Sequence, residues 1–203
     1  MARDEPAEPN PSRGLLLLAT AVTAQPAPSV RLRGAIEKAD ATSILLKERD
    51  GREISLVYAD NLAIFEVLPI DPSAIQTGTF VGTTAVPGPD GTLSAVEVHV
   101  FPEAARGTGE GHRPWDLLPN STMTNATVTS ITPGPNERTI TLRYKDGEKK
   151  VVVPNGIPIV TNVSGDRSLL VVGAKVIVDE RLQNGQAIMS RVIVGRNGFA
   201  PPM

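Results

Sequence analysis

Short hydrophobic runs separated by turn residues make up most of the chain. Val96, Val98 and Val100 alternate with the polar residues Glu97 and His99, so the valines are expected to face a core. Alternation with a period of two is typical of half-buried β-strands, and Asp-Gly, Asn-Gly and Gly-Pro pairs are typical of the turns between them. The pattern predicts an all-β protein with strands near 30–38, 42–48, 52–58, 62–67, 79–86, 92–101, 126–132, 137–145, 148–153, 157–162, 174–181 and 186–194.

The strand pattern occurs twice along the sequence. The turn Arg49-Asp50-Gly51 recurs as Lys145-Asp146-Gly147, and Asp71-Pro72-Ser73-Ala74-Ile75 has a counterpart in Asp166-Arg167-Ser168-Leu169. Each of the last two segments predicts one helical turn, and we expect Asp71 to cap the first, with Pro72 at its first helical position. The recurrence indicates an internal duplication, and it predicts two copies of one fold.

The duplication also predicts the domain organisation. About six short strands in some 70 residues are typical of a small closed or partly open β-barrel. We therefore expect two small barrels in tandem, joined by an ordered connector. The expected parts are a signal peptide at 1–24, a linker at 25–29, a first barrel at 30–101, a connector at 102–124, a second barrel at 125–196 and a tail at 197–203.

The N-terminal segment predicts export to the periplasm or outside the cell. The apolar run 15–22 is followed by small residues that suit cleavage after Ala24. The leader is atypical because Asp4, Glu5 and Glu8 make the preceding region acidic, and a disordered tail with a chance leucine run is the alternative. The run is shorter than the roughly 20 apolar residues that cross a membrane, so no membrane span is expected.

Composition narrows the function classes. The formal net charge is -2 at pH 7, and aromatic residues make up 3% of the chain. Nucleic-acid binding requires a dense basic patch or aromatic stacking platforms, so we expect no nucleic-acid partner. Cysteine is absent, which excludes disulfides, thiolate catalysis and Cys-ligated zinc.

The turn motifs carry a resemblance to a known group of domains. The first copy has a Gly34-Ala35-Ile36 start, an Asp-Gly hairpin, a step at 75–81 and a closing strand that begins Gly91-Thr92-Leu93-Ser94-Ala95. In these features it resembles the OB-like β-barrel domains of unknown function in exported bacterial proteins, some of which are labelled metal-transporter components. The resemblance implies two tandem OB-like barrels, and it implies no catalytic residues.

The connector 102–124 is the one long segment that is not repeated, and it contains the only tryptophan, Trp115. Three interpretations remain open. In the first, Trp115 and Leu117 plug a barrel end or the groove between the copies. In the second, His112, Arg113, Trp115 and Asp116 form a ligand or partner site, with Arg113 holding a carboxylate or phosphate.

The third interpretation is a soft-metal site. Imidazole and thioether ligands suit copper, so His112 and Met123 beside Trp115 are candidate ligands. His99 is a further candidate, although a solvated or interdomain histidine is the simpler expectation for its strand position.

No motif in the sequence has the spacing of a catalytic site. The glycines of 107–111 lack the phosphate-loop pattern, and no nucleophile elbow occurs. We therefore expect a non-catalytic exported binding or scaffolding protein that needs no cofactor, with an unknown protein or small ligand as its partner. The alternative is a periplasmic copper chaperone or sensor that uses His112, Trp115 and Met123. The sequence leaves the oligomeric state open.

Overall fold

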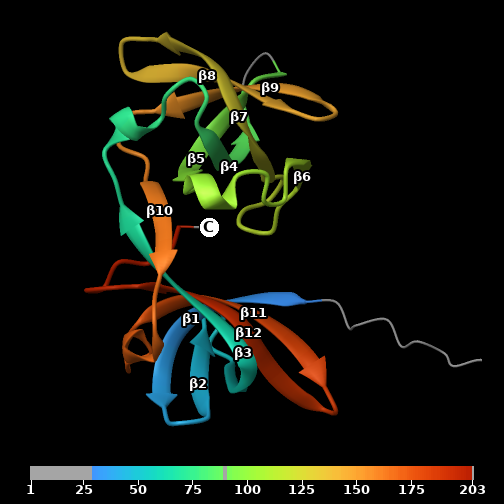
Figure 1. Cartoon of the computed structure of the whole chain (residues 1–203), viewed down its shortest axis with the longest axis vertical. Helices are drawn as coiled ribbons and strands as arrows, with labels where there is room; N and C mark the ends of the chain where they lie inside the picture. The colour runs from blue at the N-terminus through green and yellow to red at the C-terminus, as the bar shows by residue number, and fades with distance from the viewer. Residues whose placement is uncertain (1–28, 89–90, 203) are drawn as a thin grey trace, which may run out of the picture.

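The computed structural model describes residues 29–88 and 91–202, whose strands form one twelve-stranded sheet (Figure 1). The predicted all-β class is confirmed. The predicted signal peptide and all of the linker except Ser29 lie outside the described residues. The strands are β1 (Val30–Ala39), β2 (Ser43–Glu48), β3 (Glu53–Pro69), β4 (Phe80–Pro87), β5 (Leu93–Val100), β6 (Gly111–Pro114), β7 (Thr122–Pro133), β8 (Glu137–Tyr144), β9 (Gly147–Pro154), β10 (Ile159–Ser164), β11 (Lys175–Gln183) and β12 (Gln186–Gly195).

Five of these strands close into a mixed barrel. Strands β11, β1, β2 and β3 are antiparallel neighbours, and β12 pairs with β11 on one side and in parallel with β3 on the other. Alternate apolar side chains of these strands fill the interior, including Leu32, Ile36, Ile44, Leu46, Leu56, Val176, Val178, Met189, Val192 and Val194. The closed barrel combines β1–β3 from the first sequence copy with β11 and β12 from the second, so it does not coincide with either copy.

The other seven strands lie outside the closed barrel. In Figure 1, strands β4 to β9 form the upper part of the molecule. Strand β10 and the end of β3 run between this part and the closed barrel. Strand β4 pairs with β5 and β7, the order continues through β8 to β9, and β9 meets β5 in parallel over two residue pairs. The pairing therefore shows one closed barrel with seven outer strands, and it does not show two barrels in tandem.

The predicted strands agree with the observed ones except at two places. Residues 52–58 and 62–67 were expected as separate strands, but β3 runs unbroken through both. Its middle stays extended even though the register with β12 jumps from Tyr58 to Ala63 there. Strand β6 was not predicted, because four residues that include glycine and proline show no alternation, and it forms by pairing with β7.

The two predicted helical turns are confirmed. The short 3-10 helices η1 (Pro72–Ala74) and η4 (Arg167–Leu169) each follow an aspartate. In both, the aspartate carboxylate accepts a hydrogen bond of 2.8 Å from the backbone amide of the serine two residues later. This bond satisfies an amide at the start of the turn, which explains why the aspartate recurs in both copies.

Strand β5 buries both of its faces. Val98 lies in the core of the outer strands and Val100 packs against that core, as the alternation predicts. The register shift opposite β4 between Thr84 and Ala85 removes Val96 from this row. Glu97 and His99, on the other side of the strand, are 0% and 1% exposed. Polar side chains of β5 are therefore enclosed between the outer strands and the barrel.

Candidate functional site

A cavity of about 130 Å³ lies between the closed barrel and the outer strands. Its walls come from elements that are distant in the sequence. The lining side chains include Arg31, Ile177, Arg191 and Ile193 from the barrel, His99, Met123 and Asn125 from the outer strands, Asn162 from β10, and Arg113 and Trp115 from the predicted connector. The cavity is therefore a feature of the tertiary fold, because no single sequence segment contains it.

Strand register explains why the lining residues of the outer strands lie on one face of the sheet. Gly82 is paired with His99 on one side and Asn125 on the other, and Met123 is paired with Arg113. Side chains in register, or two residues apart, share one face of a sheet. A side chain at Gly82 would meet the Asn125 Oδ1 atom at 2.7 Å, so the glycine keeps this part of the face open.

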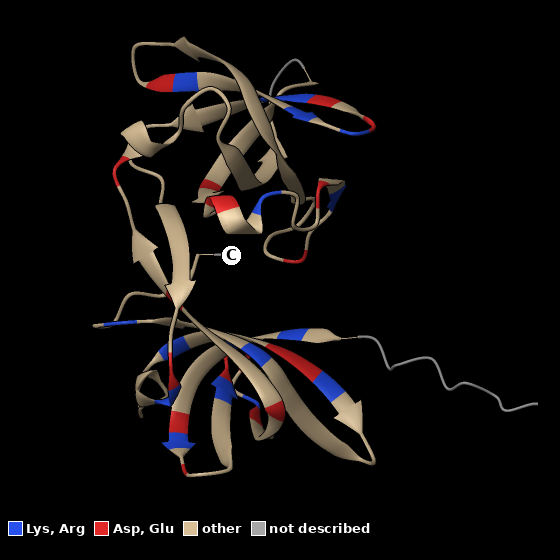
Figure 2. Cartoon of the chain, viewed as in Figure 1, with Lys and Arg blue, Asp and Glu red and all other residues tan. Residues whose placement is uncertain are grey.

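On the barrel side of the cavity, three neighbouring strands carry a row of charged residues. Asp179 is paired in register with Arg31 of β1 and Arg191 of β12. Its carboxylate lies 3.2 Å from Arg31 Nε and 3.6 Å from Arg191 Nη1. Figure 2 shows basic and acidic residues both on these barrel strands and on the segment before β6. Two arginines thus share one carboxylate at the edge of the cavity.

Trp115 lies between arginines that come from the two parts of the molecule. The guanidinium of Arg31 is 4.3 Å from the centre of the Trp115 ring, and that of Arg113 is 5.3 Å away. Arg113 also donates a hydrogen bond of 2.8 Å from Nη1 to the Gly109 carbonyl. These cation–π contacts hold the half-buried indole against the cavity.

Asp116 forms an ion pair between the connector and the barrel. Both of its carboxylate oxygens accept hydrogen bonds of 2.9 Å from the guanidinium of Arg33. Hydrogen bonding from Arg33 lowers the pKa of Asp116, and partial burial opposes this effect. The aspartate therefore stays ionised and paired at the rim, outside the cavity lining.

Replacing Asp116 with alanine should lower the free energy of unfolding by less than about 1 kcal/mol, because its side chain is 53% exposed and solvent screens the ion pair. Urea unfolding of the variant and the wild type checks this value. A loss of several kcal/mol would instead mean that this contact holds the two parts of the molecule together.

Four buried polar atoms at the cavity have no hydrogen-bond partner among the residues that the structure describes. They are His99 Nδ1, Trp115 Nε1, Asn125 Oδ1 and Asn162 Oδ1, out of six such side-chain atoms found among the described residues. The two asparagines are 5% and 8% exposed. An unpaired buried polar atom costs about 1–3 kcal/mol, so folded proteins contain few of them. Their concentration here marks the cavity as the candidate site.

The charge of the cavity is positive at neutral pH. Burial, followed by the charge of Arg191, lowers the pKa of His99 to about 4, so this imidazole is neutral. Burial and the charge of Arg31 also lower the pKa of Arg113. Both shifts have a nearby guanidinium among their causes, which indicates positive charge that Asp179 does not fully balance.

The structure separates the predicted site residues into two groups. Arg113, Trp115, Met123 and His99 line the cavity. His112 lies on the opposite face of the sheet, where its Nδ1 atom is 2.8 Å from Thr124 Oγ1. Adjacent residues of a strand point to opposite sides, so His112 and Met123 do not face one another.

The arginines and asparagines Arg31, Arg191, Asn125 and Asn162 line the cavity but were not among the predicted candidates. Arg31 and Arg191 look like ordinary exposed strand residues in the sequence. Asn125 and Asn162 carry a weak signal, because asparagine is depleted in β-strands and both lie within apolar or threonine-rich strands. That signal could have found the asparagines, but not their convergence.

Glu97 is a buried carboxyl group beside the site. Its Oε1 atom accepts hydrogen bonds from Thr84, at 2.9 Å from Oγ1 and 3.2 Å from the backbone amide. Burial raises the pKa of Glu97 to about 7, and the two hydrogen bonds oppose this rise. Glu97 does not line the cavity.

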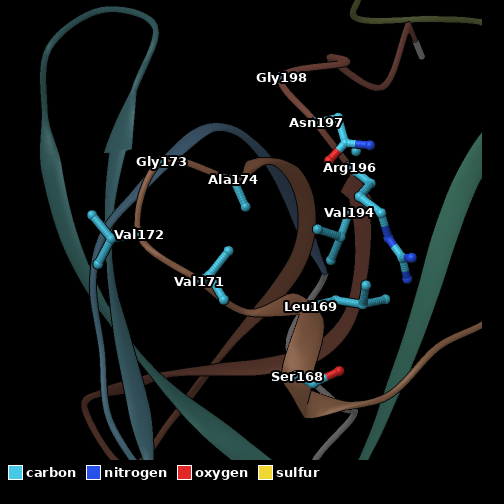
Figure 3. Close-up of a pocket in the computed structure, with 11 residues that line it drawn as sticks. Ser168, Leu169, Val171, Val172, Gly173, Ala174, Val194, Arg196, Asn197 and Gly198 are labelled. Carbon is cyan, nitrogen blue, oxygen red and sulfur yellow. The ribbon is translucent and has the colours of Figure 1, made fainter.

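A larger and more open hollow of about 560 Å³ lies at the η4 end of the barrel (Figure 3). Leu169, Val171 and Val172 form much of its wall. Arg196, which also lines it, forms an ion pair of 2.8 Å with Glu66. The hollow contains none of the unpaired buried polar atoms, so its chemistry gives less reason to assign a ligand than that of the smaller cavity.

Comparison with known proteins adds no identity. No family model, curated protein or solved structure matches this chain. Across residues 29–88 and 91–202, no group of three or more histidine, aspartate or glutamate residues is arranged to hold a metal ion. The same residues include no helix with the length and apolar character needed to cross a membrane. The resemblance to exported OB-like domains stays a prediction.

Proposed function

We propose that this protein is a non-catalytic exported binding protein that holds a small ligand in the cavity between the barrel and the outer strands. The observation that supports it most strongly is the convergence of four unpaired buried polar atoms on one cavity. Binding sites have few, precisely placed polar groups within a mostly formed pocket, and this arrangement fits that description. A ligand that pairs with these atoms would offset the cost of burying them.

The fold that we propose for this role is a pair of OB-like barrels that have exchanged strands. In this arrangement β4 and β5 of the first copy join β7, β8 and β9 of the second, and the short parallel contact of β9 with β5 supports the closure. The duplicated sequence would then place the ligand between two equivalent halves. Export to the periplasm is part of the same proposal, and it rests on the predicted leader.

A thermal-shift screen tests whether the cavity binds a small molecule. We expect at least one member of a panel of anionic, neutral and cationic small molecules to raise the melting temperature of the full chain and to change the fluorescence of Trp115. The same member should lose its effect in Asn162→Leu, which removes an unpaired acceptor from the cavity.

Asn162→Leu is informative because it should not harm folding. Replacing the unpaired Asn162 Oδ1 with an apolar side chain of similar size leaves no new buried polar group without a partner, so folding should be retained. The exposed Asn136→Leu is the matched control and should bind like the wild type. If no panel member binds more tightly than about 1 mM, or if Asn162→Leu binds as the wild type does, the proposed function is wrong.

Copper binding is a second candidate because His99 and Met123, a soft-ligand pair, line the cavity together with Trp115. Three arginines at the same cavity oppose the entry of a cation. If copper nevertheless binds there, Cu(I) should quench Trp115, and Met123→Leu should abolish the quenching while His112→Ala preserves it. The positive charge makes an anionic ligand the better supported choice.

A further inference from the structure

We propose that the cavity recognises a short hydroxycarboxylate, a ligand with one carboxylate and at least one hydroxyl group. This inference rests on the proposed function and names the class of its ligand. Three features of the cavity lead to it: an arginine without an ion pair, a mixture of unpaired donors and acceptors, and a small volume.

Arg113 is the arginine whose charge favours an anionic ligand. Arg31 and Arg191 share the carboxylate of Asp179, whereas Arg113 has an ion pair with no acidic side chain of the described residues. Its contacts are the Gly109 carbonyl and the face of Trp115. A guanidinium has five donor hydrogens in a planar fork that matches a carboxylate, so Arg113 keeps donors for a ligand anion.

The unpaired atoms require a ligand that also donates. Trp115 Nε1 can only donate a hydrogen bond, which suits a carboxylate oxygen. Asn125 donates from Nδ2 to the Thr108 carbonyl at 2.9 Å, and this bond fixes its unpaired Oδ1 as an acceptor. Asn162 Oδ1 is a second unpaired acceptor. A simple carboxylate would leave both acceptors unpaired, whereas a hydroxyl group donates to one of them.

A hydroxyl group fits these acceptors better than an ammonium group does. Arg31, Arg113 and Arg191 all line the cavity, and a positively charged amine would be repelled by them. Amino acids should therefore bind more weakly than hydroxy acids, even though both carry a carboxylate and a donor.

The size of the cavity favours a small ligand. Its volume of about 130 Å³ is below the roughly 300–1,000 Å³ of pockets that hold drug-sized molecules. Lactate and glycerate are suitable probes because they are small and carry both required groups.

Isothermal titration of the full chain with lactate, glycerate and three lactate analogues tests the proposal. Propionate lacks the hydroxyl group, lactamide lacks the charge, and alanine replaces the hydroxyl with an ammonium group. We expect lactate or glycerate to bind with a Kd below about 1 mM and each analogue to bind at least about tenfold more weakly. Arg113→Gln should weaken the binding by at least about tenfold, because it removes a charged hydrogen bond.

The exposed Arg143→Gln on β8 is the matched control and should bind like the wild type. Equal binding of lactamide would overturn recognition of charge, and equal binding of propionate would overturn recognition of the hydroxyl group. If none of the hydroxycarboxylates binds but another panel member does, the ligand class is wrong and the proposed function stands. If no small molecule binds at all, both are wrong.

Discussion

Replacing Glu97 with glutamine should raise the free energy of unfolding at pH 8 by about 2 kcal/mol. Burial raises the pKa of Glu97 from 4.5 to about 7 in the folded protein, so the folded state prefers the protonated carboxyl group. The stability that this group contributes is complete below pH 4.5 and is lost as the pH rises through 7. A shift of this size corresponds to about 3 kcal/mol, and burying the glutamine amide offsets part of the gain.

Urea unfolding at pH 5 and pH 8 measures the effect. The difference in free energy of unfolding between variant and wild type should grow from pH 5 to pH 8. Glu148→Gln, at an exposed position of β9, should show no such growth. A variant that is less stable than the wild type at pH 8 would show that Glu97 is ionised and stabilised by its hydrogen bonds with Thr84.

Replacing His99 with glutamine should change the free energy of unfolding with the opposite pH dependence. Burial and the charge of Arg191 lower the pKa of His99 from 6.5 to about 4, so the folded protein prefers the neutral imidazole. The stability from this group is present above pH 6.5 and is lost as the pH falls through 4, when the unfolded chain takes up a proton. The contribution of His99 to this loss is about 3 kcal/mol, and it should be absent from the variant.

Urea unfolding of His99→Gln and of the wild type at pH 4 and pH 7 measures the effect. The two buried groups act in opposite directions between pH 4.5 and 6.5, so the wild type should show little net change in that window. The free energy of unfolding of His99→Gln relative to the wild type should be higher at pH 4 than at pH 7. An equal difference at both pH values would show that His99 does not contribute.

Local sequence signals accounted for the strands but not for their partners. Alternation and turn residues depend on neighbours in the sequence, so most strand positions and both helical turns were predictable. Separate strands were expected at 52–58 and 62–67, yet β3 passes through the polar pair Asp60-Asn61 between them. Nothing local indicates that β1–β3 close a barrel with β11 and β12, because that pairing depends on contacts across almost the whole chain.

The candidate site was predictable only where it lies on unusual sequence. Trp115 and Arg113 stood out because the segment 102–124 is not repeated, and both line the cavity. His112 was grouped with them by proximity in the sequence, but adjacent strand residues face opposite sides of a sheet. The contributions of Arg31 and Asn162 depend on the meeting of the barrel with the outer strands, which no single segment encodes.

A high-resolution crystal structure of the full chain, purified from the cell and then soaked with lactate, tests the central claim most directly. We expect a bound small molecule beside the Arg113 guanidinium, with its oxygens within hydrogen-bond distance of Trp115 Nε1 and of Asn125 or Asn162 Oδ1. The contradictory result is a cavity in which these atoms pair only with water or with one another, both before and after the soak.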